Sequence, residues 1–247
     1  MTKQPAHFRG ILTPRSRVRY MTWRLLGGKR PIDLGLVSGL RLRVRSLATT
    51  DYGTAWQMFW RRDYESPQTL HNVRQVVDLG ANVGYSCLYW CHEYPECQVT
   101  AYEPHPVHLE AIDDNLARNG FLDRVKVVAA AAGSKEGRLY LTDAGSSTAI
   151  TRHPSAFQVS VIDIFRVREM TGAIDILKID IEGGEYELLS DPRFAGLDVR
   201  ALVVEWHTTA EHPDGREWCV QRLQSLGYQT YIGCEDLPLA GLVWGFR

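Results

Sequence analysis

From residue 75 onward the chain alternates short apolar runs with segments of helical periodicity, and this feature constrains the fold most. The apolar runs are 75–79, 98–102, 125–130, 174–181 and 201–206. The helical segments are 85–93, 105–119, 162–170, 185–190 and 215–226. Strands that are apolar throughout are buried on both faces, as in a parallel sheet with helices on either side. The sequence therefore predicts an α/β fold.

The C-terminal end departs from simple alternation. Two strand-like runs, 228–232 and 241–246, follow the last predicted helix, with Gly233 and Pro238 between them. These turn residues suit a hairpin, so we expect the mostly parallel sheet to end in an antiparallel C-terminal hairpin. The repeating pattern starts only after residue 70, which predicts a small N-terminal lobe over 1–70 and the α/β domain over 71–247.

The N-terminal lobe is basic. Residues 1–50 hold 11 of the 28 Lys and Arg residues but only one of the 29 acids. Residues 15–30 predict a short basic amphipathic helix, and residues 35–46 and 54–60 predict strands. Such a charge split indicates contact with nucleic acid or an anionic membrane surface, but a solvated arm is the commoner outcome. We expect no nucleic-acid partner.

The strand-to-helix turn VVDLGANVGYSCLYW at 76–90 is a candidate ligand site. Ligands of open parallel sheets bind outside the C-terminal ends of the strands, where this turn falls. Gly80 and Gly84 allow positive φ and close approach of the backbone. Asp78 at the strand end is expected to accept hydrogen bonds from a ligand, with Asn82 in the turn.

A second acid, Glu103, ends the next strand, where a carboxylate can accept both hydroxyls of a ribose. Asn82 stands where a dinucleotide site has its middle glycine, which disfavours a pyrophosphate. A nucleoside with an amine and a carboxylate but no phosphate suits Asp78 better, and S-adenosylmethionine fits that description. Small residues around Ala130 leave room for its adenine.

Three segments resemble the FkbM family of S-adenosylmethionine-dependent methyltransferases: 76–90, AYEPHPVHLEAIDDNL at 101–116 with Glu103-Pro104, and IDILKIDIEGGEYELL at 174–189. The resemblance covers roughly residues 70–246. It implies a class I methyltransferase (Rossmann-like) fold with strand order 3-2-1-4-5-7-6 and strand 7 antiparallel. It also implies an O-methyltransferase that uses S-adenosylmethionine and acts on hydroxyls of sugars or natural products.

Catalytic candidates lie at the ends of the fourth and fifth strands. On a continuous strand Lys178, Asp180 and Glu182 point the same way, and a buried lysine there needs an acid partner. We expect Asp180 to orient the substrate hydroxyl or act as general base, and also to border the cofactor. Glu182 is expected to share the catalytic role or to bind the cofactor. His207 ends the fifth strand and titrates near neutrality, which suits a general base.

Hard ligands at Asp180, Glu182, Glu205 and His207 would suit Mg²⁺ or Mn²⁺, but no diagnostic ligand spacing is present and we expect no metal. The polar loop 145–150 is expected to reach over the cofactor.

The remaining features concern the protein's location, its oligomeric state and the alternative functions. Five cysteines without a C-x-x-C pair indicate reduced, mostly buried thiols, and no apolar run is long enough to cross a bilayer, so we expect a cytoplasmic protein. Whether the chain forms a homo-oligomer is open. The alternatives to a small-molecule enzyme are an RNA or protein methyltransferase and a non-catalytic binding protein.

Overall fold

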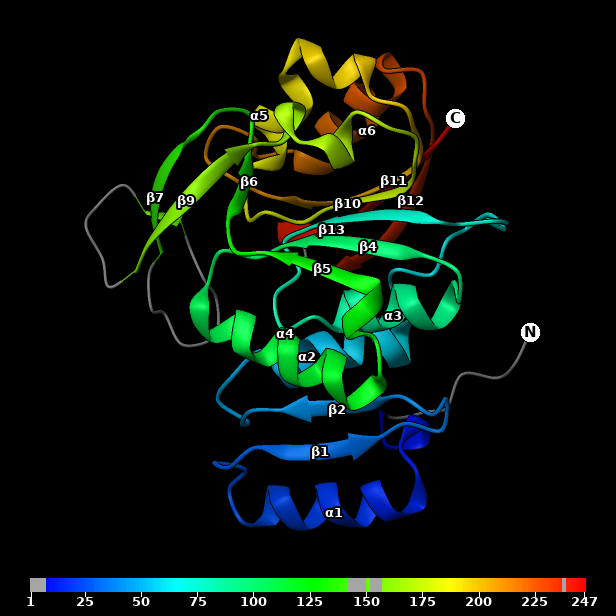
Figure 1. The fold of residues 1–247 in the computed structure, drawn as a ribbon, viewed down its shortest axis with the longest axis vertical. Coiled ribbons are helices and arrows are strands. Elements are labelled where there is room, and N and C mark those ends of the chain that lie inside the picture. Colours follow the sequence, from blue (N-terminus) through cyan, green and yellow to red (C-terminus); the bar gives the residue numbers. More distant parts are fainter. Residues whose placement is uncertain (1–7, 142–149, 152–156, 237–238) are drawn as a thin grey trace.

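A seven-stranded sheet lies at the centre of the computed structural model, which describes residues 8–141, 150–151, 157–236 and 239–247 (Figure 1). Its strand order is β12-β13-β11-β10-β3-β4-β5. The strands are β3 (Gln75–Leu79), β4 (Gln98–Tyr102), β5 (Val125–Val128), β10 (Ile174–Ile179), β11 (Val199–His207), β12 (Gln229–Asp236) and β13 (Ala240–Phe246). When these seven strands are numbered 1 to 7 along the chain and read from the β5 edge, their order is the predicted 3-2-1-4-5-7-6.

The direction of the strands also agrees with the prediction. Strands β5, β4, β3, β10 and β11 pair in parallel. Strand β13 is antiparallel to both neighbours, β11 and β12. The mostly parallel α/β sheet with an antiparallel C-terminal hairpin is therefore confirmed.

Helices cover both faces of this sheet. The long helices α3 (Tyr85–Glu93) and α4 (Pro106–Asn119) lie on one side, and α5 (Glu185–Ser190) and α6 (Gly215–Ser225) on the other (Figure 1). Val76 belongs to the apolar cluster under α3 and α4, whereas its neighbour Val77 belongs to the cluster under α5 and α6. Successive strand residues point to opposite faces, so both must be apolar. All five cysteines are free and four are buried, as expected.

The N-terminal lobe contains α1 (Pro14–Leu25), the antiparallel pair β1 (Ile32–Gly35) and β2 (Arg41–Val44), α2 (Asp51–Ala55) and a π-helical turn (Trp56–Arg61). The predicted basic helix is present, but residues 35–46 form a turn and β2 rather than one strand. The predicted strand at 54–60 is wrong, because its buried residues, Ala55 and Met58, follow a helical spacing. The boundary at residue 70 stays a prediction.

A second sheet of order β6-β9-β7-β8 stands beside the C-terminal ends of the parallel strands. It comprises β6 (Ala131–Gly133), β7 (Gly137–Leu141), β8 (Ile150–Thr151) and β9 (Phe157–Asp163). The predicted strand at 125–130 ends early, at Val128, because the chain leaves the main sheet for β6. The predicted helix at 162–170 is wrong: the Asp163 carboxylate accepts a bond from Phe165 N (3.1 Å) and starts two short 3-10 turns.

Candidate active site

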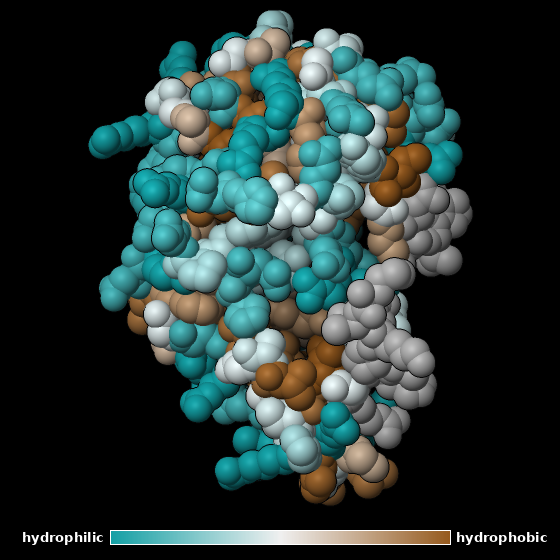
Figure 2. Space-filling view, turned by 90° about the vertical axis from the view of Figure 1, so that its right-hand side faces the viewer, coloured by the Kyte–Doolittle hydropathy of each residue, from teal (hydrophilic) through white to brown (hydrophobic). Residues whose placement is uncertain are grey.

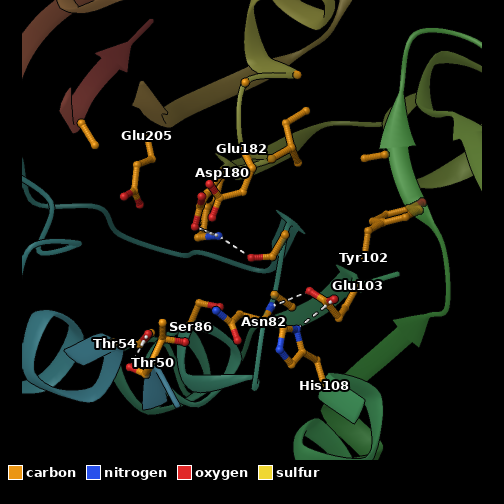
Figure 3. Close-up of a pocket in the computed structure, with 18 of the residues that line it drawn as sticks. Thr50, Thr54, Asn82, Ser86, Tyr102, Glu103, His108, Asp180, Glu182 and Glu205 are labelled. Atoms are coloured by element: carbon orange, nitrogen blue, oxygen red, sulfur yellow. Dashed lines mark hydrogen bonds and ion pairs between the residues drawn. The ribbon is translucent and has the colours of Figure 1, made fainter. Parts of the chain in front are cut away.

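A cavity of about 1120 Å³ lies at the C-terminal ends of β3, β4, β10 and β11 (Figure 3). The strand ends form its floor, residues 131–135 of the second sheet form one wall, and parts of 47–64 from the N-terminal lobe form another. Its acidic lining residues are Asp63, Glu103, Asp180, Glu182, Glu187 and Glu205. The cavity therefore occupies the edge of the sheet at which the sequence predicted a ligand.

The two glycines of the first turn have positive φ, +88° at Gly80 and +81° at Gly84. A Cβ at Gly80 would lie 1.8 Å from the carbonyl oxygen of Asp180, so the turns after β3 and β10 can meet only at a glycine. Gly80 lines the cavity, whereas Gly84 packs against Ile112 of α4 and does not. The predicted ligand contact thus has a structural basis at Gly80 alone.

Glu103 is held at the cavity wall by the backbone. Its carboxylate accepts hydrogen bonds from Asn82 N (2.9 Å) and His105 N (2.8 Å), and His108 Nδ1 lies 3.2 Å away. The residue is only 5 % exposed, but it still lines the cavity (Figure 3), as does Pro104. These bonds fix the carboxylate before any ligand arrives, which suits the predicted role in holding hydroxyl groups.

Asn82 offers an unused acceptor at the same wall. Its φ is +50°, a conformation that asparagine tolerates better than most residues. The buried Oδ1 has no hydrogen-bond partner among the described residues, and the side chain lines the cavity. A buried acceptor without a partner is costly, so a hydrogen-bond donor on a bound ligand would relieve that cost.

Asp78 does not face the cavity, contrary to the expectation that it binds a ligand directly. Its side chain is fully buried, and its Oδ1 lies 3.2 Å from Lys178 Nζ. Lys178 also lies 3.2 Å from Asp180 Oδ2 and donates to Gly80 O (2.8 Å), which confirms the predicted pairing of this lysine. Burial lowers the pKa of Lys178, but Asp180 and Asp78 outweigh it and raise the pKa above its usual range.

Asp180 and Glu182 both line the cavity, but they are not successive residues of one strand face. Strand β10 ends at Ile179, and Glu182 has φ +52°, so the expected alternation through residue 182 is wrong. Asp180 remains beside Lys178, whereas the Glu182 side chain is 55 % exposed. Partial burial and the nearby Asp180 raise the pKa of Glu182.

His207 lies in an acidic setting that changes its chemistry. Its Nδ1 is 3.1 Å from the buried Glu185 carboxylate, and its Nε2 is 3.7 Å from Glu182. Burial lowers the pKa of His207, but the bond to Glu185 and the charges of Asp180, Glu185 and Glu182 raise it to about 9. The imidazole is therefore protonated at neutral pH, and the expectation that it titrates near neutrality as a general base does not fit this structure.

Glu205 has the properties that the sequence assigned to His207. It lines the cavity on β11, and Tyr64 Oη donates a hydrogen bond to its Oε2 (2.7 Å). Burial and then the charge of Asp180 raise the pKa of Glu205 to about 7. A carboxylate with that pKa is suited to accept a proton at neutral pH. Sequence reasoning had placed Glu205 only among possible metal ligands, although its position at a strand end was a usable signal.

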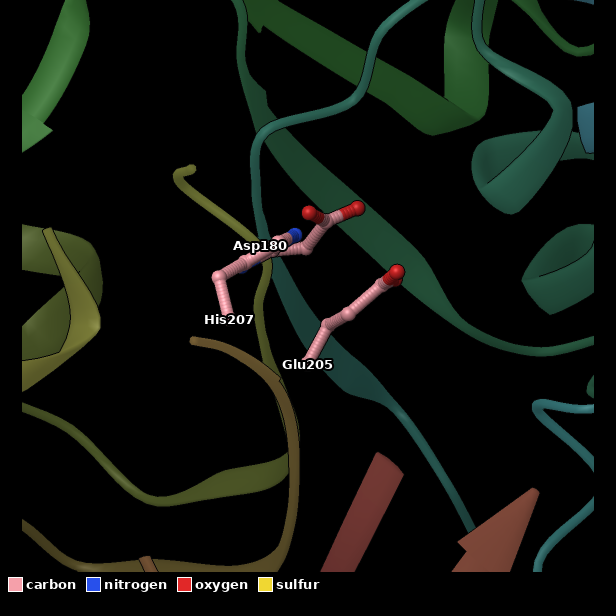
Figure 4. A group of neighbouring side chains, drawn as sticks. All are labelled: Asp180, Glu205 and His207. Carbon is pink, nitrogen blue, oxygen red and sulfur yellow. The ribbon is translucent and has the colours of Figure 1, made fainter. Parts of the chain in front are cut away.

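Asp180, Glu205 and His207 form a group whose ligand atoms all lie within 4.8 Å of one another (Figure 4). Their oxygens and imidazole nitrogen would suit a divalent cation. However, Lys178 already places a positive charge beside Asp180, and the imidazole of His207 carries another at neutral pH. These charges oppose a cation in the present arrangement, so the absence of a catalytic metal stays a prediction.

The N-terminal lobe contributes to the cavity through residues that the sequence did not single out. Thr50, Thr54 and Tyr64 line the cavity, as does Ser86 at the start of α3 (Figure 3). No pattern in the sequence marks these lobe residues, because only the tertiary fold brings them to the strand ends. Ala130 is buried and lies behind the wall, where its neighbours Ala131 and Ala132 provide the lining. Of the predicted loop 145–150, residues 145–149 lie outside the described residues.

The sequence matches a known protein family. The model of the methyltransferase FkbM domain matches residues 78–230, more than half of the chain. The chain belongs to the FkbM methyltransferase family. It is therefore a methyltransferase by family, and S-adenosylmethionine is the cofactor that this family implies.

Named relatives agree with this assignment. The methyltransferase sdnD of Sordaria araneosa is 31 % identical over 182 residues, covering 56 % of this chain and 68 % of the relative. Methyltransferase 1 of Beauveria bassiana is 25 % identical over 141 residues, covering 46 % of this chain and 56 % of the relative. The chain thus spans little more than half the length of the second protein.

Two solved structures share the fold. The methyltransferase FkbM of Methylobacillus flagellatus KT has a TM-score of 0.54 at 18 % identity, covering 77 % of this chain and 48 % of that protein. P. horikoshii TYW2 in complex with MeSAdo has a TM-score of 0.50 at 12 % identity, covering 95 % of this chain and 83 % of that protein. This chain spans about half the length of the former. At these identities the likeness concerns the class I methyltransferase fold alone.

The cavity of this FkbM-family protein fits the cofactor that the family implies. A fixed carboxylate, Glu103, suits the ribose, and the partnerless Asn82 Oδ1 suits a donor group of the ligand. The small residues Ala131, Ala132 and Gly133 line the wall expected for an adenine. A volume of about 1120 Å³ exceeds the usual upper range for a single small-molecule site, so a second molecule has room beside the cofactor.

Proposed function

We propose that the protein transfers the methyl group of S-adenosylmethionine to a hydroxyl of a small molecule, such as a sugar or a natural product. The observation that carries this proposal is the position of Glu205, which lines the cavity beside Asp180 and accepts a hydrogen bond from Tyr64 Oη. Burial and the charge of Asp180 raise the pKa of this carboxylate to about 7. A hydroxyl is a weak nucleophile and gains from a base that removes its proton during attack. A carboxylate whose pKa is raised toward neutrality suits that role.

In this proposal, Glu103 accepts the ribose hydroxyls of the cofactor and Asn82 Oδ1 accepts a donor from it. Gly80 and Pro104 supply the closely approaching backbone, while Asp78 acts indirectly by holding Lys178. When bound, S-adenosylmethionine supplies an electrophilic methyl group on its sulfonium. The turn after β3 packs closely against the backbone of Asp180, whose N–H donates to Leu79 O (3.0 Å), so the cofactor end and the acceptor end of the site are in direct contact.

The acceptor would lie between the strand ends and the N-terminal lobe. Asp180 orients its hydroxyl, and Glu205 accepts the hydroxyl proton as the oxygen attacks. Lys178 holds Asp180 in place, and Tyr64 holds Glu205. Such fixed alignment of reactants is worth up to about 7–11 kcal/mol of a barrier in favourable cases. Glu182 borders the same space and is the remaining candidate for acceptor binding.

The charge of this end of the cavity favours small neutral or cationic acceptors over RNA. Asp180, Glu182 and Glu205 gather where an acceptor would sit. Lys178 and the protonated His207 offset them only in part, because Lys178 also pairs with Asp78 and His207 with Glu185. A phosphate brought near this group would meet like charges, which oppose binding. The lobe adds apolar lining at Trp56 and Met58, which suits a partly apolar molecule.

Two steps test the proposal. In the first, melting curves are recorded with S-adenosylhomocysteine and with NAD⁺. A ligand at about 100 times its Kd adds roughly 2.7 kcal/mol to the free energy of unfolding. For a chain of this size, that raises Tm by about 5–11 °C. Only S-adenosylhomocysteine should shift the wild-type midpoint, and Glu103→Gln should reduce the shift. A panel of hydroxylated acceptors is then assayed, in which Glu205→Gln keeps the shift but loses turnover. A shift with NAD⁺, or methylation of RNA alone, would overturn the proposal.

A further inference from the structure

Helix α1 is apolar on two opposite faces. Its inner face packs on β1, and Tyr20 and Trp23 are buried on this face. Its outer face carries Val18, Met21 and Leu25, whose exposed fractions are 67 %, 47 % and 87 %. Spacings of three and four residues place these three side chains in one stripe along the helix, here called the outer stripe.

Arginines flank the outer stripe on both sides. At 100° per residue, Arg15 and Arg19 fall on one side of the stripe and Arg17 and Arg24 on the other, and all four are exposed. Arg15 and Arg19 make no hydrogen bond or ion pair with another described residue. No acid occurs anywhere in 14–30. The helix therefore presents an apolar stripe between two cationic edges.

The stripe lies at one extreme of the molecule. Figure 1 shows α1 at the end opposite α5 and α6, with β1 and β2 between it and the rest of the fold. At that end, Figure 2 shows hydrophobic and hydrophilic surface side by side. Leu26, which follows the helix, adds a side chain that is 79 % exposed. A flat partner could approach the stripe without meeting another part of the described chain.

We propose that α1 is an interfacial helix that docks the protein on an anionic lipid bilayer. The outer stripe inserts at the boundary between headgroups and acyl chains, and the four arginines contact anionic headgroups. A solvated charge run would not require three large apolar side chains facing outward. Nucleic acid would engage the arginines but leave the stripe in water. Among the described residues no helix is long and apolar enough to cross a membrane, so α1 would bind peripherally.

Sedimentation of the full chain with vesicles tests this docking. The protein should bind phosphatidylcholine vesicles that contain phosphatidylserine, bind pure phosphatidylcholine vesicles much less, and dissociate as salt increases. Each arginine near an anionic surface is worth about fivefold in partitioning, so Arg15→Ala with Arg19→Ala should weaken binding about 30-fold. Val18→Glu with Leu25→Glu should weaken it by at least about tenfold for each side chain removed from the boundary.

The control is Leu122→Glu, which changes a leucine of similar exposure, 53 %, away from α1. It should bind vesicles like wild type, and circular dichroism and melting curves should show that every variant is folded. The proposal is overturned if anionic vesicles fail to bind the wild-type protein, or if the stripe variant binds them as well as wild type. It is also overturned if ultracentrifugation shows that the wild-type protein is a dimer and the stripe variant a monomer. RNA binding that the arginine variant loses and the stripe variant keeps would overturn it as well.

Discussion

The buried pair Asp78–Lys178 allows a prediction of definite size. Lys178 is 2 % exposed and Asp78 is fully buried, and their nearest charged atoms are 3.2 Å apart. In the substitution Lys178→Met the volume is nearly kept but the charge is lost. Among the side chains that the structure describes, the Asp78 carboxylate then retains only the weak contact with Cys87 Sγ at 3.9 Å.

Breaking such a pair by removing one partner costs about 3–5 kcal/mol, because the remaining charge stays buried without compensation. For a chain of this length that corresponds to a drop of roughly 6–20 °C in Tm. Urea unfolding followed by circular dichroism measures the change. The double variant Asp78→Asn with Lys178→Met removes both fully buried charges and should recover most of the loss, since replacing a buried pair is often nearly neutral. Asp180 also loses its lysine, but its side chain is 23 % exposed and keeps access to water.

The matched control is Lys126→Met. Lys126 also pairs with a carboxylate, Glu169, but the lysine side chain is 63 % exposed. A surface pair of this kind contributes about 0–1 kcal/mol. If Lys178→Met costs no more than Lys126→Met, or if the double variant is as unstable as the single one, the reasoning about the buried pair is refuted.

Four further predictions follow from the site. Turnover should rise with pH through about 7 as Glu205 ionises, and Glu205→Gln should remove this rise and lower turnover by roughly 10²–10⁴. Asp180→Asn should lower turnover while the affinity for S-adenosylhomocysteine, measured by calorimetry, stays nearly unchanged. Because the pKa of His207 is raised to about 9, its protonated form stabilises the fold fully below pH 6.5, and this contribution should disappear as the pH rises through about 9. The free energy of unfolding of His207→Gln, measured across this pH range, should lack that decline. Treatment with EDTA should leave the rate unchanged.

Each of these has an opposing result. A flat pH profile for wild type would exclude Glu205 as the base. Loss of S-adenosylhomocysteine binding in Asp180→Asn would make that residue part of the cofactor site. An identical decline of stability in His207→Gln would assign it to other groups. Inactivation by EDTA that Mg²⁺ or Mn²⁺ reverses would turn the group in Figure 4 into a metal site.

The sequence by itself determined the sheet and the position of the site. Apolar strands such as 75–79 must be covered on both faces, and this local requirement already implies a parallel sheet with helices on both sides. The positive φ of Gly80 follows from the turn that joins strand to helix. The pairing of Lys178 follows from its apolar neighbours, because a buried ammonium group needs a counter-charge.

Only the tertiary structure decided the roles within the site. Asp78 turns inward because Lys178 lies on the adjacent strand, a relation that depends on strand pairing and not on local sequence. The proton-accepting role expected of His207 falls to Glu205 instead. The bond to Glu185 raises the pKa of His207, whereas burial and the charge of Asp180 raise the pKa of Glu205. A pKa reflects burial and all nearby charges, and these are set when distant segments meet. The lobe residues of the cavity wall, such as Thr50 and Tyr64, have no signature in the sequence for a related reason: only the folded chain brings them to the strand ends.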